Sequence, residues 1–319
     1  MSYLTYVLFI FGLVLITYSA NILVKYTEHI SYDLNISHFF SSLIFIGLAT
    51  SSPEIFIALL ASLDNKSNIA IGNALGSNIA NISLVFAITF LFIKMNKDSL
   101  PNSFARDVKA FFIYLVLISL LLIPLLGDGQ INPIDSVILL ITFLLFLFYL
   151  KKYIYHEKKD GKPINQSNLL YNFLAILLSI VMLIVGTQVF LDSSVKIATF
   201  FGVPNYVIGL SLTAIGTSIP ELAASIQSAR KKNIDFIIGN ILGSNIFNIV
   251  LVLGLVGFVD YNSQSFIGYN EFLRDIAMII STTILLIIMS KNYNMYLSRL
   301  LGVVLFSGFL IYQYNLYIY

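Results

Sequence analysis

The sequence contains no cysteine and no tryptophan, and it is poor in charged residues. Of its 319 residues, 58% are hydrophobic and only 11% are charged, whereas soluble domains are about 45–50% apolar and about 25% charged. The lack of cysteine excludes disulfides, thiolate metal sites and cysteine nucleophiles. The three histidines, His29, His38 and His156, are too scattered to form a ligand set. A chain with so little charge cannot hide its apolar residues in a soluble fold, so the composition predicts a multi-pass membrane protein.

Long apolar segments fill most of the sequence. A membrane-spanning helix needs about 20 predominantly apolar residues, and this criterion predicts ten spans. Their ranges are Tyr3–Val24, Ser37–Leu63, Ile69–Ile93, Ala105–Leu126, Ile134–Tyr153, Leu169–Leu191, Tyr206–Ala229, Phe236–Val259, Phe272–Met289 and Leu300–Tyr317. The first run lacks a basic leader and a clear cleavage site, so we expect a retained helix and not a signal peptide. The stretch Ser193–Phe201 is expected to form a short interfacial helix.

The longest polar gap divides the predicted spans into two halves of five. We expect a first repeat at 1–150, a cytoplasmic linker at 151–168 and a second repeat at 169–319. With the N-terminus outside, the inner loops carry 15 Lys and Arg residues and the outer loops carry 3. Basic residues collect on the cytoplasmic side, so both termini are predicted to lie outside. Two homologous halves with an odd number of spans would insert upside-down relative to each other, as in many secondary transporters.

One segment of the sequence occurs twice, at an offset of 167 residues. Residues 47–83 and 214–250 agree at 14 of 37 positions. Each copy reads Thr-Ser-x-Pro-Glu, beginning at Thr50 and at Thr217, and then Gly-Asn-x-x-Gly-Ser-Asn-Ile-x-Asn. Most of the shared residues are small or polar, so the repeat does not reflect shared hydrophobicity alone.

Each copy places one carboxylate, Glu54 or Glu221, well inside an apolar span. A charge there costs at least about 2.5–3.5 kcal/mol, and no Lys or Arg lies in the middle of any predicted span. The compensating positive charge must therefore be a cation from solution. A structural helix-end role is the alternative for one such residue, but two at the same offset with the same companions favour a binding site.

The neighbours of both glutamates supply oxygen. Pro53 and Pro220 lack an N–H, which frees the carbonyls of Ala49 and Gly216. Hydroxyl and amide groups follow in both copies, at Thr50, Ser51, Ser77 and Asn81, and at Thr217, Ser218, Ser244 and Asn248. With no His or Cys nearby the site is all oxygen, which suits hard cations such as Ca²⁺ and Na⁺. Four glycines are expected to let helices approach closely: Gly72, Gly76, Gly239 and Gly243.

At these residues the chain resembles the Ca²⁺:cation antiporter superfamily, in particular the prokaryotic sodium/calcium exchangers. The resemblance implies a central Ca²⁺ held by Glu54 and Glu221, with further central ligands at Thr50, Thr217, Asn81 and Asn248. It implies Na⁺ sites near Ser51, Ser77 and the Gly47 carbonyl on one side, and near Ser218, Ser244 and the Ala214 carbonyl on the other. The first and sixth spans would slide across the remaining eight to alternate access.

The expected function is Ca²⁺ export in exchange for Na⁺, with H⁺ as the alternative coupling ion, because protons can compete for buried carboxylates. Some members of the family carry Asp at the position of Asn248. Here both central amides are neutral, so two carboxylates balance one Ca²⁺, whereas three Na⁺ would leave one surplus positive charge.

A channel is disfavoured by the broken helices, and an intramembrane hydrolase is disfavoured by the lack of an accompanying His or Cys. We expect no enzymatic activity, no cofactor and no nucleic-acid partner. We expect a functional monomer embedded in the lipid bilayer of the cell (inner, cytoplasmic) membrane.

Overall fold

The computed structural model describes residues 3–92, 107–156, 168–203, 212–260, 268–291 and 295–318. All regular elements within these ranges are helices. The α-helices are α1 (Tyr3–Asp33), α2 (His38–Ser41), α3 (Gly47–Thr50), α4 (Ser52–Leu63), α5 (Ser67–Ala80), α6 (Ala87–Phe92), α7 (Asp107–Leu126), α8 (Pro133–His156), α9 (Leu169–Phe200), α11 (Thr213–Thr217), α12 (Ile219–Arg230), α13 (Ile234–Phe247), α14 (Leu253–Val259), α15 (Tyr269–Lys291) and α16 (Met295–Ile318). Three π-helical segments interrupt them: η1 (Ser42–Ile46), η2 (Asn81–Phe86) and η6 (Asn248–Val252).

Seven helices in these ranges are long and apolar enough to cross a membrane, or eight if α2–α3 and α4 form one broken span. The two parts of that span, His38–Thr50 and Ser52–Leu63, meet at an angle of 40°. The described residues are therefore all-helical with seven to eight candidate spans. The count of ten and the outer position of both termini stay predictions. So does the division into two repeats, since most of the predicted linker lies outside the described residues.

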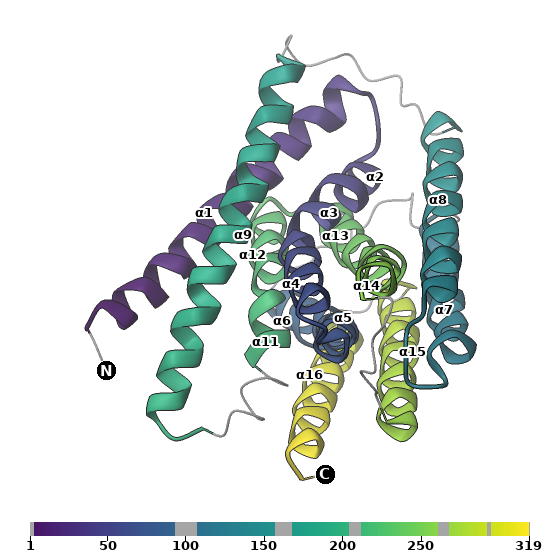
Figure 1. Ribbon diagram of the computed structural model, residues 1–319. Coiled ribbons are helices and arrows are strands. Elements are labelled where there is room, and N and C mark those ends of the chain that lie inside the picture. Colours follow the sequence, from purple (N-terminus) through teal and green to yellow (C-terminus); the bar gives the residue numbers. More distant parts are fainter. Residues whose placement is uncertain are drawn as a thin grey trace.

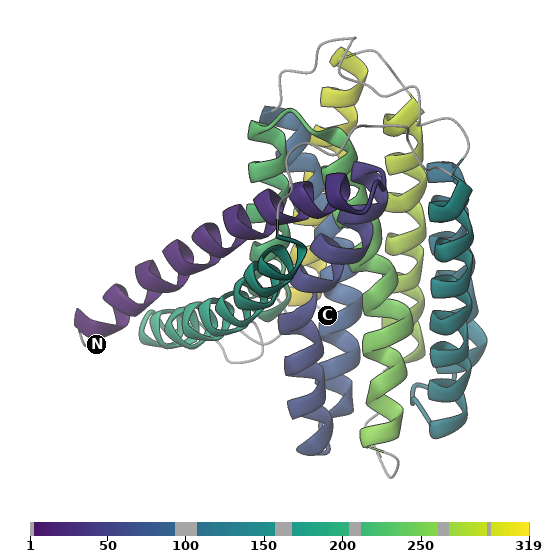
Figure 2. The same cartoon turned by 90° about the horizontal axis from the view of Figure 1, so that it is seen from above.

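Helices α1 and α9 lie side by side and run obliquely to the other helices (Figures 1 and 2). They contain 31 and 32 residues, hence about 47 Å each at 1.5 Å per residue, which exceeds the roughly 30 Å hydrocarbon core. The separate interfacial helix expected at Ser193–Phe201 is wrong, because α9 continues through it. The hydroxyls of Ser193 and Ser194 donate to carbonyls four residues earlier, over 2.7 Å each, and so keep their polar groups within the helix.

The buried apolar residues form two clusters. The larger cluster joins α5 and α13 to the outer helices α7, α8, α15 and α16. The smaller one joins α1 and α9 to the central helices, where Ala49 and Ala224 pack between them. Helices α1 and α9 contribute to the smaller cluster and not to the larger one.

Two glycines of the repeated segment allow α13 to approach η1 and α2. A Cβ on Gly239 would lie 2.5 Å from the Phe39 carbonyl oxygen, and one on Gly243 would lie 2.3 Å from the Leu43 carbonyl oxygen. The expectation of close approach fails at Gly72, the counterpart of Gly239, because nothing lies within 4 Å of a Cβ placed there. Gly72 is exposed, since the first copy turns this face of α5 away from its neighbours.

We expect Gly239→Ala to lower the melting temperature in detergent and Gly72→Ala to leave it unchanged or raise it. Gly239→Ala would push Cβ into a backbone oxygen and should cost about 1–3 kcal/mol, as overpacking does. Gly72→Ala has room and should be neutral or stabilise the helix by up to about 1 kcal/mol. Circular dichroism melting of both variants checks this, and equal shifts in the two would contradict the packing described here.

Candidate cation-binding site

Glu54 and Glu221 each lie in the first turn of a helix that begins inside the protein. The helices α4 and α12 start directly after Ser51 and Ser218, whose ψ angles are both 0°. A proline occupies the first turn of each helix, where its missing N–H costs no hydrogen bond. The positive ends of two helix dipoles therefore lie beside the two carboxylates.

Both glutamate side chains are fully buried. None of their four carboxylate oxygens has a hydrogen-bond partner among the described residues, and the two carboxylates are close enough to interact electrostatically. Buried polar groups are almost always hydrogen-bonded, and an isolated buried charge is costly. Four such oxygens in one buried region are the arrangement that a bound cation would stabilise.

The carboxylate of Glu221 faces hydroxyls from the other copy of the motif and from α13. Thr50 and Ser51 precede α4, and Ser244 belongs to α13. Thr50 Oγ1 lies 3.0 Å from Ser244 Oγ, and Ser244 donates to the Gly47 carbonyl over 3.3 Å. Ser51 Oγ is buried and has no partner among the described residues. Carboxylate, hydroxyl and carbonyl oxygens therefore meet at this point.

Glu54 has the reciprocal surroundings. Its carboxylate faces Thr217, which precedes α12, and Ser77 of α5. Thr217 Oγ1 lies 2.9 Å from Ser77 Oγ and donates to the Ala214 carbonyl over 3.3 Å. Ser218 Oγ, like its counterpart in the first copy, is buried without a partner in the described part of the chain. The two copies thus form two matching oxygen clusters.

The structure pairs the serines differently from the sequence-based grouping. That grouping put Ser77 with the Gly47 carbonyl and Ser244 with the Ala214 carbonyl. In the structure Ser244 donates to Gly47, and Ser77 lies beside Thr217. The reason is that α13 packs against α3 and α5 packs against α11. Each helix that follows a glutamate therefore meets the break of the other copy.

Amide side chains extend these clusters along α5 and α13. Asn81 and Asn248 begin the π-helical segments η2 and η6, and such segments often mark functional positions. Asn81 Nδ2 donates to Asn245 Oδ1 over 3.1 Å, and Asn78 Nδ2 donates to the Asn245 carbonyl over 3.2 Å. Asn81 Oδ1 and both polar side-chain atoms of Asn248 are buried without a partner among the described residues. These oxygens directly follow the helices that carry Ser77 and Ser244.

Sequence reasoning missed Ser225 and gave Asn240 no role of its own. Asn240 Nδ2 donates to Ser225 Oγ over 3.1 Å and to the Glu221 backbone carbonyl over 3.3 Å, so these contacts hold the start of α12. Ser225 follows Glu221 by four residues, and this spacing, which places both on one face of a helix, could have identified Ser225 from the sequence. The first copy has Ala58 at that position, and Asn73 Nδ2 lacks a partner among the described residues.

The donor set fits a hard cation that binds reversibly. It consists of carboxylate, hydroxyl, amide and carbonyl oxygens, which Ca²⁺ and Na⁺ prefer. Within the described ranges, no group of three or more His, Cys, Asp or Glu residues could hold a metal ion. His38 instead hydrogen-bonds with Asn233 over 2.8 Å. The candidate site thus combines two carboxylates with neutral oxygens.

Known proteins are similar to this chain over nearly its whole length, including both copies of the motif. The family model described as "Sodium/calcium exchanger protein" matches residues 4–152 and 171–318. The chain is 30% identical to the inner membrane protein YrbG of Escherichia coli, over 97% of this chain and 96% of that one. It is 27% identical to the sodium/calcium exchanger MaX1 of Methanosarcina acetivorans, over 94% and 95%.

The fold is also similar to that of a solved transporter. The structure of the sodium-calcium exchanger NCX_Mj, soaked with Na⁺ and Ca²⁺, superimposes with a TM-score of 0.78 at 26% identity, covering 98% of each chain. The family match and the alignments extend over nearly the whole chain, and both motif copies fall within them. The chain is therefore a multi-pass membrane protein that belongs to the sodium/calcium exchanger family.

Proposed function

We propose that the protein is a secondary antiporter that exports Ca²⁺ from the cell across the inner membrane in exchange for Na⁺. The observation that carries this proposal is the set of four buried carboxylate oxygens on Glu54 and Glu221 that have no partner among the described residues. Ca²⁺ neutralises both carboxylates at once. Na⁺ ions bind in the two hydroxyl clusters and neutralise the same carboxylates one at a time.

Exchange follows from competition for shared ligands. The Glu221 cluster includes Thr50 and Ser244, and the Glu54 cluster includes Thr217 and Ser77. A cation in either cluster uses a carboxylate that Ca²⁺ also needs, so simultaneous tight binding of both ions is disfavoured. Ca²⁺ leaves as Na⁺ enters, and the reverse.

Alternating access is proposed to come from movement of α1 and α9. These helices form a pair set obliquely to the bundle (Figure 2), and they pack on a separate small cluster of apolar residues. Sliding of this pair across the central helices would open the buried site to one side of the membrane and then to the other. Inverted repeats with broken helices support this kind of motion in other transporters.

In vesicles containing the purified protein, an outward Na⁺ gradient should drive uptake of radiolabelled Ca²⁺, whereas H⁺ or K⁺ gradients alone should not. The reason is that the neutral hydroxyls around each carboxylate suit Na⁺. If Ca²⁺ uptake were independent of the Na⁺ gradient and were driven by a pH gradient, H⁺ would be the coupling ion and the proposed Na⁺ exchange would be rejected.

Glu54→Gln and Glu221→Gln should each abolish Ca²⁺ transport in folded protein. Removing one of two buried charged ligands should weaken Ca²⁺ binding by about 3–5 kcal/mol, or about two to four orders of magnitude. The measurement is the rise in melting temperature with Ca²⁺, together with vesicle uptake. The matched control is Asp64→Asn, whose carboxylate is 70% exposed and whose loss should change neither. Normal uptake by either glutamine variant would refute the site.

Asn248→Asp should change the charge carried per Ca²⁺. It adds a third carboxylate to the two present, so an additional positive charge is needed for neutrality. The effect of an imposed membrane potential on Ca²⁺ uptake should therefore differ from that of the natural protein. Asn248→Ser keeps a neutral oxygen and should leave the potential dependence as it was. The same dependence in both variants would place residue 248 outside the ion site.

A further inference from the structure

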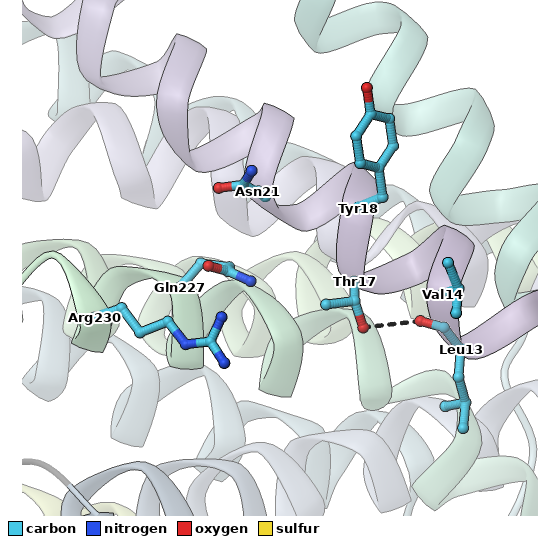
Figure 3. Close-up of a pocket in the computed structure, with 7 residues that line it drawn as sticks. All are labelled: Leu13, Val14, Thr17, Tyr18, Asn21, Gln227 and Arg230. Atoms are coloured by element: carbon cyan, nitrogen blue, oxygen red, sulfur yellow. Dashed lines mark hydrogen bonds between the residues drawn. The ribbon is translucent and has the colours of Figure 1, made fainter. Parts of the chain in front are cut away.

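A groove of about 570 Å³ lies between α1 and α12, and neither glutamate lines it (Figure 3). Gln227 and Arg230 on α12 lie opposite Thr17 and Asn21 on α1 (Figure 3). The apolar wall of the groove consists of Leu13 and Val14 of α1, and Tyr18 of the same helix also lines it. The lining residues are Leu13, Val14, Thr17, Tyr18, Asn21, Gln227 and Arg230. One end of the groove is thus polar and cationic, and the other end is apolar.

The amide and guanidinium groups of this groove are available to a ligand, whereas the Thr17 hydroxyl donates to the Leu13 carbonyl over 2.8 Å. Within the described residues, no hydrogen bond or ion pair engages the side chains of Asn21, Gln227 or Arg230. The adjacent Lys231 differs, because its Nζ lies 2.5 Å from the Glu28 carboxylate of α1. The charge of Lys231 is therefore compensated within the protein, whereas that of Arg230 is not.

The repeated segments supply an internal comparison. Helices α1 and α9 end 167 residues apart, and so do α4 and α12, so each groove residue has a counterpart between α9 and α4. The counterparts are Ile180, Val181, Ile184, Val185, Gln188, Leu60 and Leu63. The Gln188 amide already donates to Asp192 over 2.9 Å. Leucines, 47% and 67% exposed, stand where Gln227 and Arg230 lie in the other groove.

This contrast indicates a headgroup site. Acyl chains alone can cover the apolar counterpart, whereas unpartnered amides and a guanidinium would be costly if only acyl chains covered them. Arg binds phosphate through two parallel hydrogen bonds, and amides can bind the ester or glycerol oxygens next to it. The apolar wall of Leu13 and Val14 then accommodates the first part of an acyl chain.

We propose that this groove binds the headgroup of an anionic phospholipid, with Arg230 on the phosphate and with Asn21 and Gln227 on neighbouring oxygens. The bound lipid contacts both α1 and the helix that carries Glu221. Lipid binding here requires only that the chain lies in a bilayer, so it does not depend on which ion is coupled to Ca²⁺.

The absence of tryptophan allows a direct test. Tyr18→Trp places a single fluorophore at the groove, and Val185→Trp places one at the counterpart position. Each protein is reconstituted in vesicles of mixed phosphatidylglycerol and phosphatidylcholine, in which one lipid or the other carries brominated chains. Quenching by brominated phosphatidylglycerol relative to brominated phosphatidylcholine should indicate an enrichment of about fivefold in the Tyr18→Trp protein, the factor expected for one well-placed cation. No enrichment is expected in the Val185→Trp protein, and equal ratios in both proteins would overturn the proposal.

Two substitutions separate the groove from general surface charge. Arg230→Leu installs the residue of the counterpart groove and should remove the enrichment in the Tyr18→Trp protein. Lys232→Leu removes a neighbouring positive charge that does not line the groove, and it should leave most of the enrichment. If both substitutions reduced the enrichment equally, diffuse attraction to basic residues would be the cause and the site would be rejected. Melting temperatures verify that all variants are folded.

Discussion

The carboxylates of Glu54 and Glu221 are buried together in this membrane protein, no ion pair among the described residues neutralises them, and the central structure is organised around that constraint. Glu54 and Glu221 are fully buried, and their oxygens lack partners in the same part of the chain. Each lies at the start of an interior helix, where the helix dipole offsets part of the charge. The breaks at Ser51 and Ser218 provide those helix starts, and hydroxyls line the space in front of them. The helix breaks, the hydroxyls and the amides thus all contribute to stabilising the two buried carboxylates.

The two copies of the motif are each incomplete. Every oxygen cluster combines a glutamate with the break of the other copy and the helix packed against that break, as the Thr50–Ser244 and Thr217–Ser77 contacts show. The copies are not equal, however. Ser225 supports Asn240 in the second copy, whereas the first has Ala58 and leaves Asn73 Nδ2 without a partner among the described residues. The surroundings of the two carboxylates therefore differ in their hydrogen bonds, so the two Na⁺ positions proposed here are not equivalent.

The sequence predicts the candidate ligands, because polar groups repeated inside an apolar chain are costly unless they bind something. In the structure Thr50 contacts Ser244 and Thr217 contacts Ser77, and the other candidate ligands are buried as well. The crosswise pairing of Ser77 and Ser244 could not be predicted, since sequence spacing reports neighbours on one helix and says nothing about packing between copies. Gly72 shows the same limit: it repeats as Gly239, but of these two only Gly239 touches another backbone. The continuous α9 was missed because serines that bond to their own helix resemble an interfacial segment in composition.

Charge also limits how the proposed exchange can operate. In the proposed site only the two glutamates are charged, since Asn81 and Asn248 are neutral amides. One Ca²⁺ leaves this site neutral, and so do two Na⁺, whereas a third Na⁺ would add an uncompensated charge in a low-dielectric interior, at a cost of several kcal/mol. Neutral oxygens from hydroxyls and amides reduce that cost without removing it. A protein with these ligands therefore favours the exchange of one Ca²⁺ for two Na⁺, because the site is neutral with either cargo. A further carboxylate beside the pair would be needed to neutralise a third Na⁺.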